Sequence, residues 1–206
     1  MSNEEKFGQL ASDQTIEKTI AALAANGVKA EVAENGEAAK QKVLKLIPAG
    51  AEVMDMTSVT IGTVSIVKEI LESGRYNSVR NKLNKMDRKT QSAEMQKLGA
   101  APDWAVGSVH AVTEGGSVVI ASATGSQLPA YAYGATHVVW VVGAQKLVKN
   151  LDEAMKRLYE YTLPLEDERA RKAYGMGSGV NKVLIVNKEV SPGRISMIIV
   201  KERLGF

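Results

Sequence analysis

A hydroxyl-rich segment at residues 57–63 is the strongest candidate for ligand-binding chemistry. It follows a short apolar run and precedes a helical pattern, and it contains Thr57, Ser58, Thr60 and Gly62. Hydroxyls and free backbone N–H groups at the start of a helix attract an anion, and the helix dipole adds to that attraction. The segment lacks the glycine-rich pattern of a nucleoside triphosphate loop. The simpler alternative is that Thr57 or Ser58 only caps the helix.

Lys146 is the second candidate, because it follows the most apolar run of the chain at residues 137–142. If that run is a parallel strand, the lysine amine lies at the carboxyl edge of the sheet, where open α/β sheets bind their ligands. A lysine there pairs with a phosphate or a carboxylate. The alternative is a surface lysine in front of a helix.

A small-residue loop, Gly125, Ser126 and Gln127, could form a second wall of the same pocket. Small residues allow a ligand to approach the backbone closely. An ordinary turn between a strand and a helix explains the same residues equally well.

Glu114 is a further candidate, in this case for covalent catalysis. Its carboxylate could form an acyl anhydride as a nucleophile, but it lies in Thr113–Gly116, a tight turn with two adjacent glycines. A solvated carboxylate at a hairpin tip is therefore the favoured interpretation. His110 is interpreted as structural.

Composition excludes several classes of protein. The 206 residues include no cysteine and two histidines, so disulfides, iron–sulfur ligation and a histidine-rich metal site are excluded, and we expect no metal and no cofactor. The first twenty residues are polar and no run is long enough to cross a bilayer, so we expect a cytoplasmic protein without membrane contact. A net charge of +3 does not require nucleic acid, and the basic segment 75–97 has one aromatic residue for base stacking, so no nucleic-acid partner is expected.

Strands and helices alternate along the chain, which is typical of a parallel sheet with crossover helices. The polar segment 74–99 predicts one or two exposed helices, and Pro192–Gly193 predicts a turn. We expect helices at 13–26, 36–46, 130–133 and 151–161, and strands at 28–33, 51–56, 105–112, 117–121, 136–142, 182–186 and 194–200.

Four stretches, in this order, resemble the LUD (lactate utilization) domain family, of the lactate utilization protein C or LutC/YkgG-like type. They are residues 58–60, 107–116, 125–129 and 141–148, and the resemblance extends from about residue 13 to residue 171. It implies an α/β fold, a three-layer α/β/α sandwich with a mostly parallel sheet, similar to the ribose-phosphate isomerase (NagB/RpiA) and CoA-transferase group. The chain is predicted to be a single domain over 1–206 with a helical appendage at 74–100, and residues 182–206 lie beyond the stretches that match.

The resemblance implies a protein that binds a small anionic metabolite and acts in L-lactate utilization, with iron–sulfur oxidoreductase subunits as partners and a homo-oligomer as a further option. In that case the chain supplies binding or assembly, since it has no redox group. The alternative is a free-standing enzyme acting on a phosphorylated sugar or an acyl-CoA, with Glu114 or Lys146 as its catalytic residue, because a glutamate in a comparable loop is the nucleophile of the CoA-transferase group.

Overall fold

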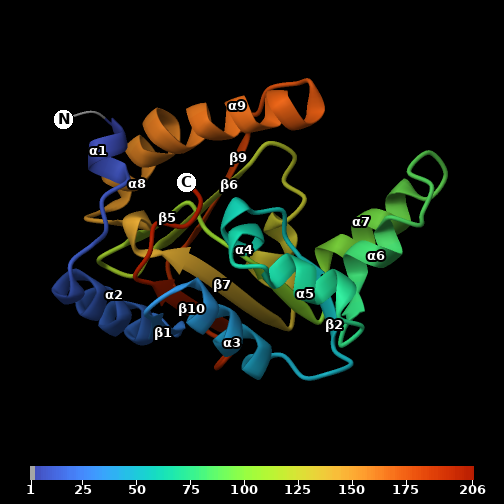
Figure 1. Cartoon of the computed structure of the whole chain (residues 1–206), viewed down its shortest axis with the longest axis horizontal. Coiled ribbons are helices and arrows are strands. Elements are labelled where there is room, and N and C mark those ends of the chain that lie inside the picture. Colours follow the sequence, from blue (N-terminus) through green and yellow to red (C-terminus); the bar gives the residue numbers. More distant parts are fainter. Residues whose placement is uncertain (1–2) are drawn as a thin grey trace.

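A six-stranded parallel sheet forms the centre of the computed structural model, which describes residues 3–206 (Figure 1). All of its neighbouring strands run parallel. This confirms the predicted α/β class with a mostly parallel sheet. In spatial order the strands are β1 (Lys29–Ala33), β10 (Ile195–Val200), β7 (His137–Gly143), β4 (Trp104–Gly107), β2 (Glu52–Asp55) and β3 (Asn77–Ser78).

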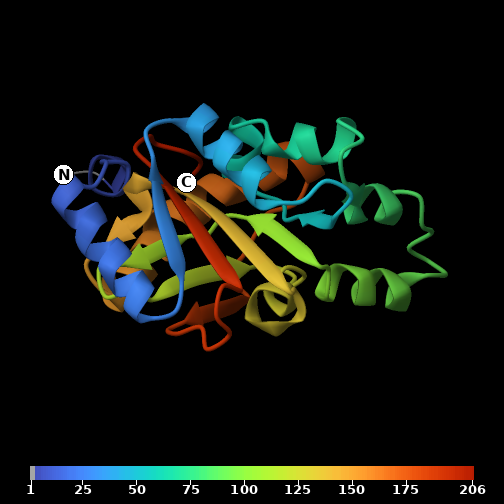
Figure 2. The same ribbon diagram turned by 90° about the horizontal axis from the view of Figure 1, so that it is seen from below.

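Three helices cover one face of this sheet: α3 (Gly36–Leu46), α4 (Val59–Thr63) and α5 (Ile66–Glu72) (Figure 2). Their apolar side chains pack on alternate residues of the central strands, because successive strand residues point to opposite faces. The boundaries of α3 agree with the prediction, since Asn35 caps its first turn and Pro48 follows its end. The predicted strand at 51–56 is confirmed as β2.

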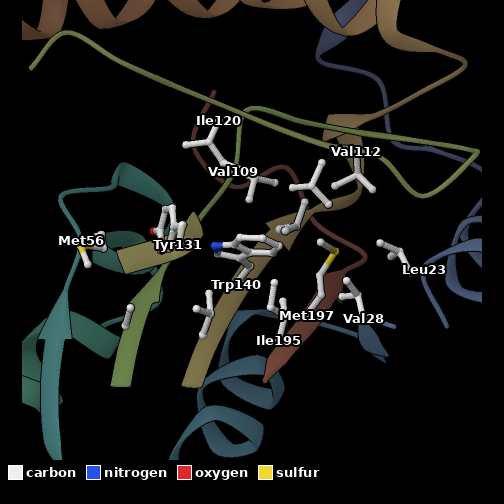
Figure 3. Close-up of a cluster of buried hydrophobic side chains, with 14 of the residues drawn as sticks. Leu23, Val28, Met56, Val109, Val112, Ile120, Tyr131, Trp140, Ile195 and Met197 are labelled. Carbon is white, nitrogen blue, oxygen red and sulfur yellow. The ribbon is translucent and has the colours of Figure 1, made fainter. Parts of the chain in front are cut away.

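The opposite face packs against α2 (Asp13–Ala25) and a second sheet that was not predicted as a separate layer. Trp140 lies at the centre of this core and packs edge-on against Tyr131, with 5.5 Å between the two ring centroids (Figure 3). Strand order in the second, mixed sheet is β8 (Leu147–Val148), β5 (Ala111–Thr113), β6 (Val118–Ser122) and β9 (Lys182–Val186).

A long helical segment covers the outer side of the second sheet (Figure 1). It consists of α8 (Leu151–Arg157), a π-helical turn η3 (Leu158–Thr162) and α9 (Leu163–Tyr174). The predicted helix at 151–161 therefore continues to Tyr174. Pro164 does not end this segment, because it lies in the first turn of α9, directly after the π-helical turn, where a proline is tolerated.

The predicted exposed helices are confirmed as α6 (Val79–Leu83) and α7 (Ser92–Ala100), which extend outward beyond the β2 side of the sheet (Figures 1 and 2). Three short helical segments complete the described chain: α1 (Asn3–Phe7), the π-helical turn η1 (Ala130–Gly134) near the predicted helix at 130–133, and the 3-10 turn η2 (Ala144–Lys146).

Three predictions of local structure need correction. The expected strand at 105–112 is two strands, β4 and β5, which belong to different sheets because the chain leaves the parallel sheet at Ser108–His110. The strands at 182–186 and 194–200 form, and Pro192–Gly193 forms a turn as predicted, but the two strands lie in different sheets. Residues 59–63 of the expected loop are helical, as α4.

Candidate functional site

The candidate site lies at the carboxyl edge of the parallel sheet. Four adjacent strands, β2, β4, β7 and β10, end at this edge, and the segment after each strand contributes to the site. Those segments supply Thr60, Ser108, Lys146 and Leu204, respectively. The prediction that Lys146 and the 57–63 segment share one edge depended on β7 being parallel, and β7 is parallel to both of its neighbours.

Lys146 is the central residue of this site and is 2% exposed. Its Nζ donates hydrogen bonds to Thr60 Oγ1 at 2.9 Å, to Ser108 Oγ at 3.2 Å and to the Val109 carbonyl at 3.2 Å. Three donors on the amine thus meet three neutral acceptors. The turn η2 orients the side chain, because it follows the end of β7 directly.

The charge on Lys146 is not compensated. Burial, with a contribution from the charge of Arg157, lowers the pKa of the Lys146 amine well below its usual value. Within residues 3–206, Lys146 forms no ion pair with a carboxylate. Burying the charged form of the amine without a counter-ion is costly, so a bound anion would favour the charged form of Lys146.

The segment after β10 closes the site from the outside. The Leu204 carbonyl accepts hydrogen bonds from Thr60 Oγ1 at 3.1 Å and from Gln145 Nε2 at 3.0 Å. Gly143 permits this close approach, since a Cβ at this position would lie 2.8 Å from Leu204 N. Thr60 therefore joins the lysine to the closing segment, and displacement of that segment would free the Thr60 hydroxyl to donate a hydrogen bond next to the amine.

A second buried cation, Arg157, lies close enough to influence Lys146 electrostatically. Its Nη1 donates to the His110 carbonyl at 2.5 Å and to Thr162 Oγ1 at 3.0 Å. His110 Nδ1 accepts a hydrogen bond from the Ala121 N–H. Burial, together with the charges of Lys146 and Arg157, lowers the pKa of His110 to about 3, so this imidazole is neutral at physiological pH. The structural interpretation of His110 agrees with these contacts.

The other predicted residues of the 57–63 segment surround Thr60 without contacting Lys146. Ser58 precedes α4, but its side chain forms no capping hydrogen bond. Thr57 and Gly62 are exposed.

The loop at 125–127 is held by its own contacts. Ser122 Oγ accepts from the Gly125 N–H at 2.8 Å and is 2.9 Å from Gln127 Oε1, while Gln127 Nε2 donates to the Ala121 carbonyl. No contact with Lys146 is found for Gly125, Ser126 or Gln127 within residues 3–206. These bonds fit a turn at the end of β6.

Glu114 lies at the tip of the β5–β6 hairpin and forms an ion pair with Lys18 at 2.6 Å. Its side chain is 25% exposed. The geometry fits a solvated carboxylate, which was the favoured interpretation, and a catalytic role for Glu114 stays a prediction.

Sequence reasoning did not select Ser108, Gln145, Arg157 or Leu204. Ser108 lies within the stretch 105–112, which is predicted as one continuous strand, and Gln145 adjoins the selected lysine. Arg157 lies in a helix with basic residues in its last turn, a pattern typical of an exposed helix end. Nothing local indicates that its side chain is fully buried.

Metal-ligating side chains do not gather in the described chain: within residues 3–206, no group of three or more histidine, aspartate or glutamate residues could hold a metal ion. No helix among these residues is both long and apolar enough to cross a membrane.

Comparison with known protein families assigns the fold. The family model described as the LUD domain matches residues 16–200. The chain belongs to the LUD domain family. The match includes β10 and so extends the resemblance, which the sequence alone supported only to about residue 171.

The architecture of this LUD domain is similar to a solved structure, a DUF162 family protein from Deinococcus radiodurans. The TM-score is 0.57 at 9% sequence identity, with 93% of this chain and 99% of the other chain covered. At this identity the likeness concerns the fold alone. No curated protein matches the chain.

Proposed function

We propose that this LUD domain binds a small anionic metabolite at the Lys146 site and acts in L-lactate utilization, in association with iron–sulfur oxidoreductase subunits. The observation that carries the proposal is the uncompensated amine of Lys146, fully enclosed at the carboxyl edge of the sheet among Thr60, Ser108 and Val109. Membership in the LUD family supports the metabolic role.

The chemistry of the site favours binding over redox catalysis by this chain alone. Without cysteine, the chain has no residue for an iron–sulfur cluster of its own. Lys146 can supply a positive charge, while Thr60 and Ser108 supply hydroxyl groups that donate or accept hydrogen bonds. Electron transfer would then require a partner subunit.

Ligand binding can be tested by isothermal titration and thermal shift with L-lactate, pyruvate, sugar phosphates and CoA esters. We expect one class of anion to bind, and Lys146→Met and Thr60→Val to weaken it at least about tenfold, because each removes a charged or hydrogen-bonded contact. Lys97→Met, on the exposed face of α7, is the matched control and should bind normally. Normal binding by Lys146→Met would contradict the proposal.

The partner can be tested separately. Iron–sulfur oxidoreductase subunits encoded beside this chain should co-purify with it at defined stoichiometry, and electron transfer from L-lactate should require both components. A complex that oxidises L-lactate equally well without this chain would exclude the metabolic role while leaving anion binding intact.

A further inference from the structure

Arg157 has an unusual hydrogen-bond arrangement for a fully buried arginine. It is 0% exposed, and only Nη1 has partners, namely the His110 carbonyl and Thr162 Oγ1. Nε and Nη2 are buried and have no hydrogen-bond partner within residues 3–206. A buried donor left without a partner destabilises the folded protein, and more so when it is charged.

The two free nitrogens form one edge of the guanidinium. Nε–H and one Nη2–H point in the same direction, so they donate two parallel hydrogen bonds to a planar anion. Arg169 of the same chain shows this geometry: its Nε and Nη2 donate to the two carboxylate oxygens of Glu166, each at 2.7 Å. In Arg157 the same edge is formed, but no carboxylate of the described chain faces it.

The surroundings fix this edge in place and leave its charge uncompensated. The two Nη1 bonds hold the guanidinium, and its Cζ lies 5.2 Å from the centre of the Tyr161 ring. Burial lowers the pKa of Arg157 to about 10, and the charge of Arg203 acts in the same direction. The guanidinium is still charged at neutral pH, and its charge contributes to the lowered pKa of the nearby Lys146 amine.

We propose that the Nε–Nη2 edge of Arg157 is a carboxylate-binding site that receives a small organic acid. The edge offers two donors, which match the two oxygens of a carboxylate, whereas a phosphate would leave a third oxygen without a donor from this residue. Because the residue is enclosed, the acid enters through local opening of the surrounding segments.

This inference rests on the proposed function only in taking the ligand to be a small anion. It names the carboxylate as the recognised group and adds Arg157, which is distinct from Lys146. The two ideas can fail separately, because Arg157 has its own spectroscopic signal.

The test is a titration of the full chain, labelled with ¹⁵N-arginine, followed through the Nε–H resonances by NMR. Acetate, L-lactate and pyruvate are compared with phosphate and chloride at constant ionic strength. We expect the Arg157 Nε–H resonance to shift saturably with carboxylates, and its exchange with water to slow. Arg194 and Arg169 are the controls, since their Nε atoms already donate, at 2.9 Å to the Ala135 carbonyl and at 2.7 Å to Glu166.

Two variants identify the Arg157 Nε–H resonance and test the role of Arg157 in carboxylate binding. Arg157→Lys removes the signal and should weaken carboxylate binding about 10–100-fold, because a single ammonium replaces two parallel charge-assisted bonds. If this variant does not fold, Thr162→Val removes one Nη1 partner and identifies the resonance by its shift.

The outcomes separate the proposals. No response of Arg157 to any carboxylate, or an equal response to chloride that indicates an adventitious ion only, would overturn the carboxylate site. An Arg157 response that survives in Lys146→Met would support the carboxylate site and place the anion at Arg157 instead of Lys146. Loss of anion binding in Lys146→Met, with no response of the Arg157 resonance, would overturn the carboxylate site and support binding of the anion at Lys146.

Discussion

At the scale of single residues, three basic side chains lie close together at the junction of the two sheets: Lys146 and Arg157, which are buried, and His110, which is partly buried. Lys146 and Arg157 donate to the backbone carbonyls of two consecutive residues, Val109 and His110, respectively. Burial lowers the pKa of all three side chains. Folding therefore disfavours the charged forms of these side chains, which no carboxylate of residues 3–206 neutralises, and a bound anion would favour the charged forms again.

The imidazole of His110 should make the protein sensitive to acid. Its pKa falls from 6.5 in the unfolded chain to about 3 in the folded protein, so the unfolded state binds more protons between these values. The part of the stability that depends on the neutral His110 imidazole is fully present above about pH 6.5. It is lost as the pH falls toward 3, by about 1–2 kcal/mol at pH 5. Urea unfolding between pH 7 and 4 measures this loss.

The control for this pH dependence is His110→Gln, whose side-chain oxygen can still accept from the Ala121 N–H. Its free energy of unfolding should vary less with pH over the same interval. An equal pH dependence in both proteins would assign the acid sensitivity to other groups.

Replacing the buried lysine should not destabilise the protein without ligand. Lys146→Met removes a desolvated charge and keeps much of the side-chain volume, and apolar replacement of buried ions is often neutral or stabilising. We expect an unchanged or higher melting temperature at pH 7. A fall equivalent to more than about 2 kcal/mol would mean that the three hydrogen bonds of the amine outweigh its desolvation.

At the scale of elements, the first turns of α2 and α4 differ in their capping hydrogen bonds. Ser12 Oγ accepts from the Thr15 N–H at 3.2 Å at the beginning of α2, whereas Ser58 forms no such bond at the beginning of α4. Ser12→Ala should therefore cost about 1 kcal/mol, and Ser58→Ala close to none, in thermal unfolding without ligand. Equal losses would show that the Ser58 hydroxyl has a structural role in α4.

The segment after β10 depends on a glycine at the end of β7. A Cβ at Gly143 would lie 2.8 Å from both the Glu202 carbonyl and Leu204 N, which are backbone atoms and cannot easily move. Gly143→Ala should displace residues 202–206, lower stability by about 1–3 kcal/mol and raise hydrogen exchange at Leu204. Gly99→Ala, with open space around its Cβ in α7, is the control and should be neutral or stabilising. Unchanged exchange in Gly143→Ala would contradict the predicted displacement.

At the scale of the whole molecule, the order of the strands in the parallel sheet does not follow the order of the chain. β10 comes last in sequence but lies between β1 and β7, near the middle of the sheet. Its residues contribute to the cores on both faces, through Ile195, Met197 and Ile199 on one side and Ile198 and Val200 on the other. The sheet is therefore incomplete until the last strand inserts.

Truncation after Asn181 should accordingly abolish cooperative unfolding, because it removes β9 and β10 and exposes the edges of β1 and β7. The control replaces the mostly exposed residues 85–91, between α6 and α7, with a Gly–Ser linker of equal length and should leave the melting transition cooperative. Calorimetry distinguishes the two outcomes. A cooperative transition in the truncated chain would contradict the central role of β10.

The sequence by itself determined the α/β class, the boundaries of α3, the strand β7, and the placement of Thr60 and Lys146 at one edge of the sheet. These features follow from local periodicity, capping residues and the direction of parallel strands. Only the tertiary structure decided that Ser108, Arg157 and Leu204 join them. Their roles depend on which strands are neighbours and which side chains become buried, and contacts between residues as distant in the chain as Thr60 and Leu204 leave no periodic pattern in either segment.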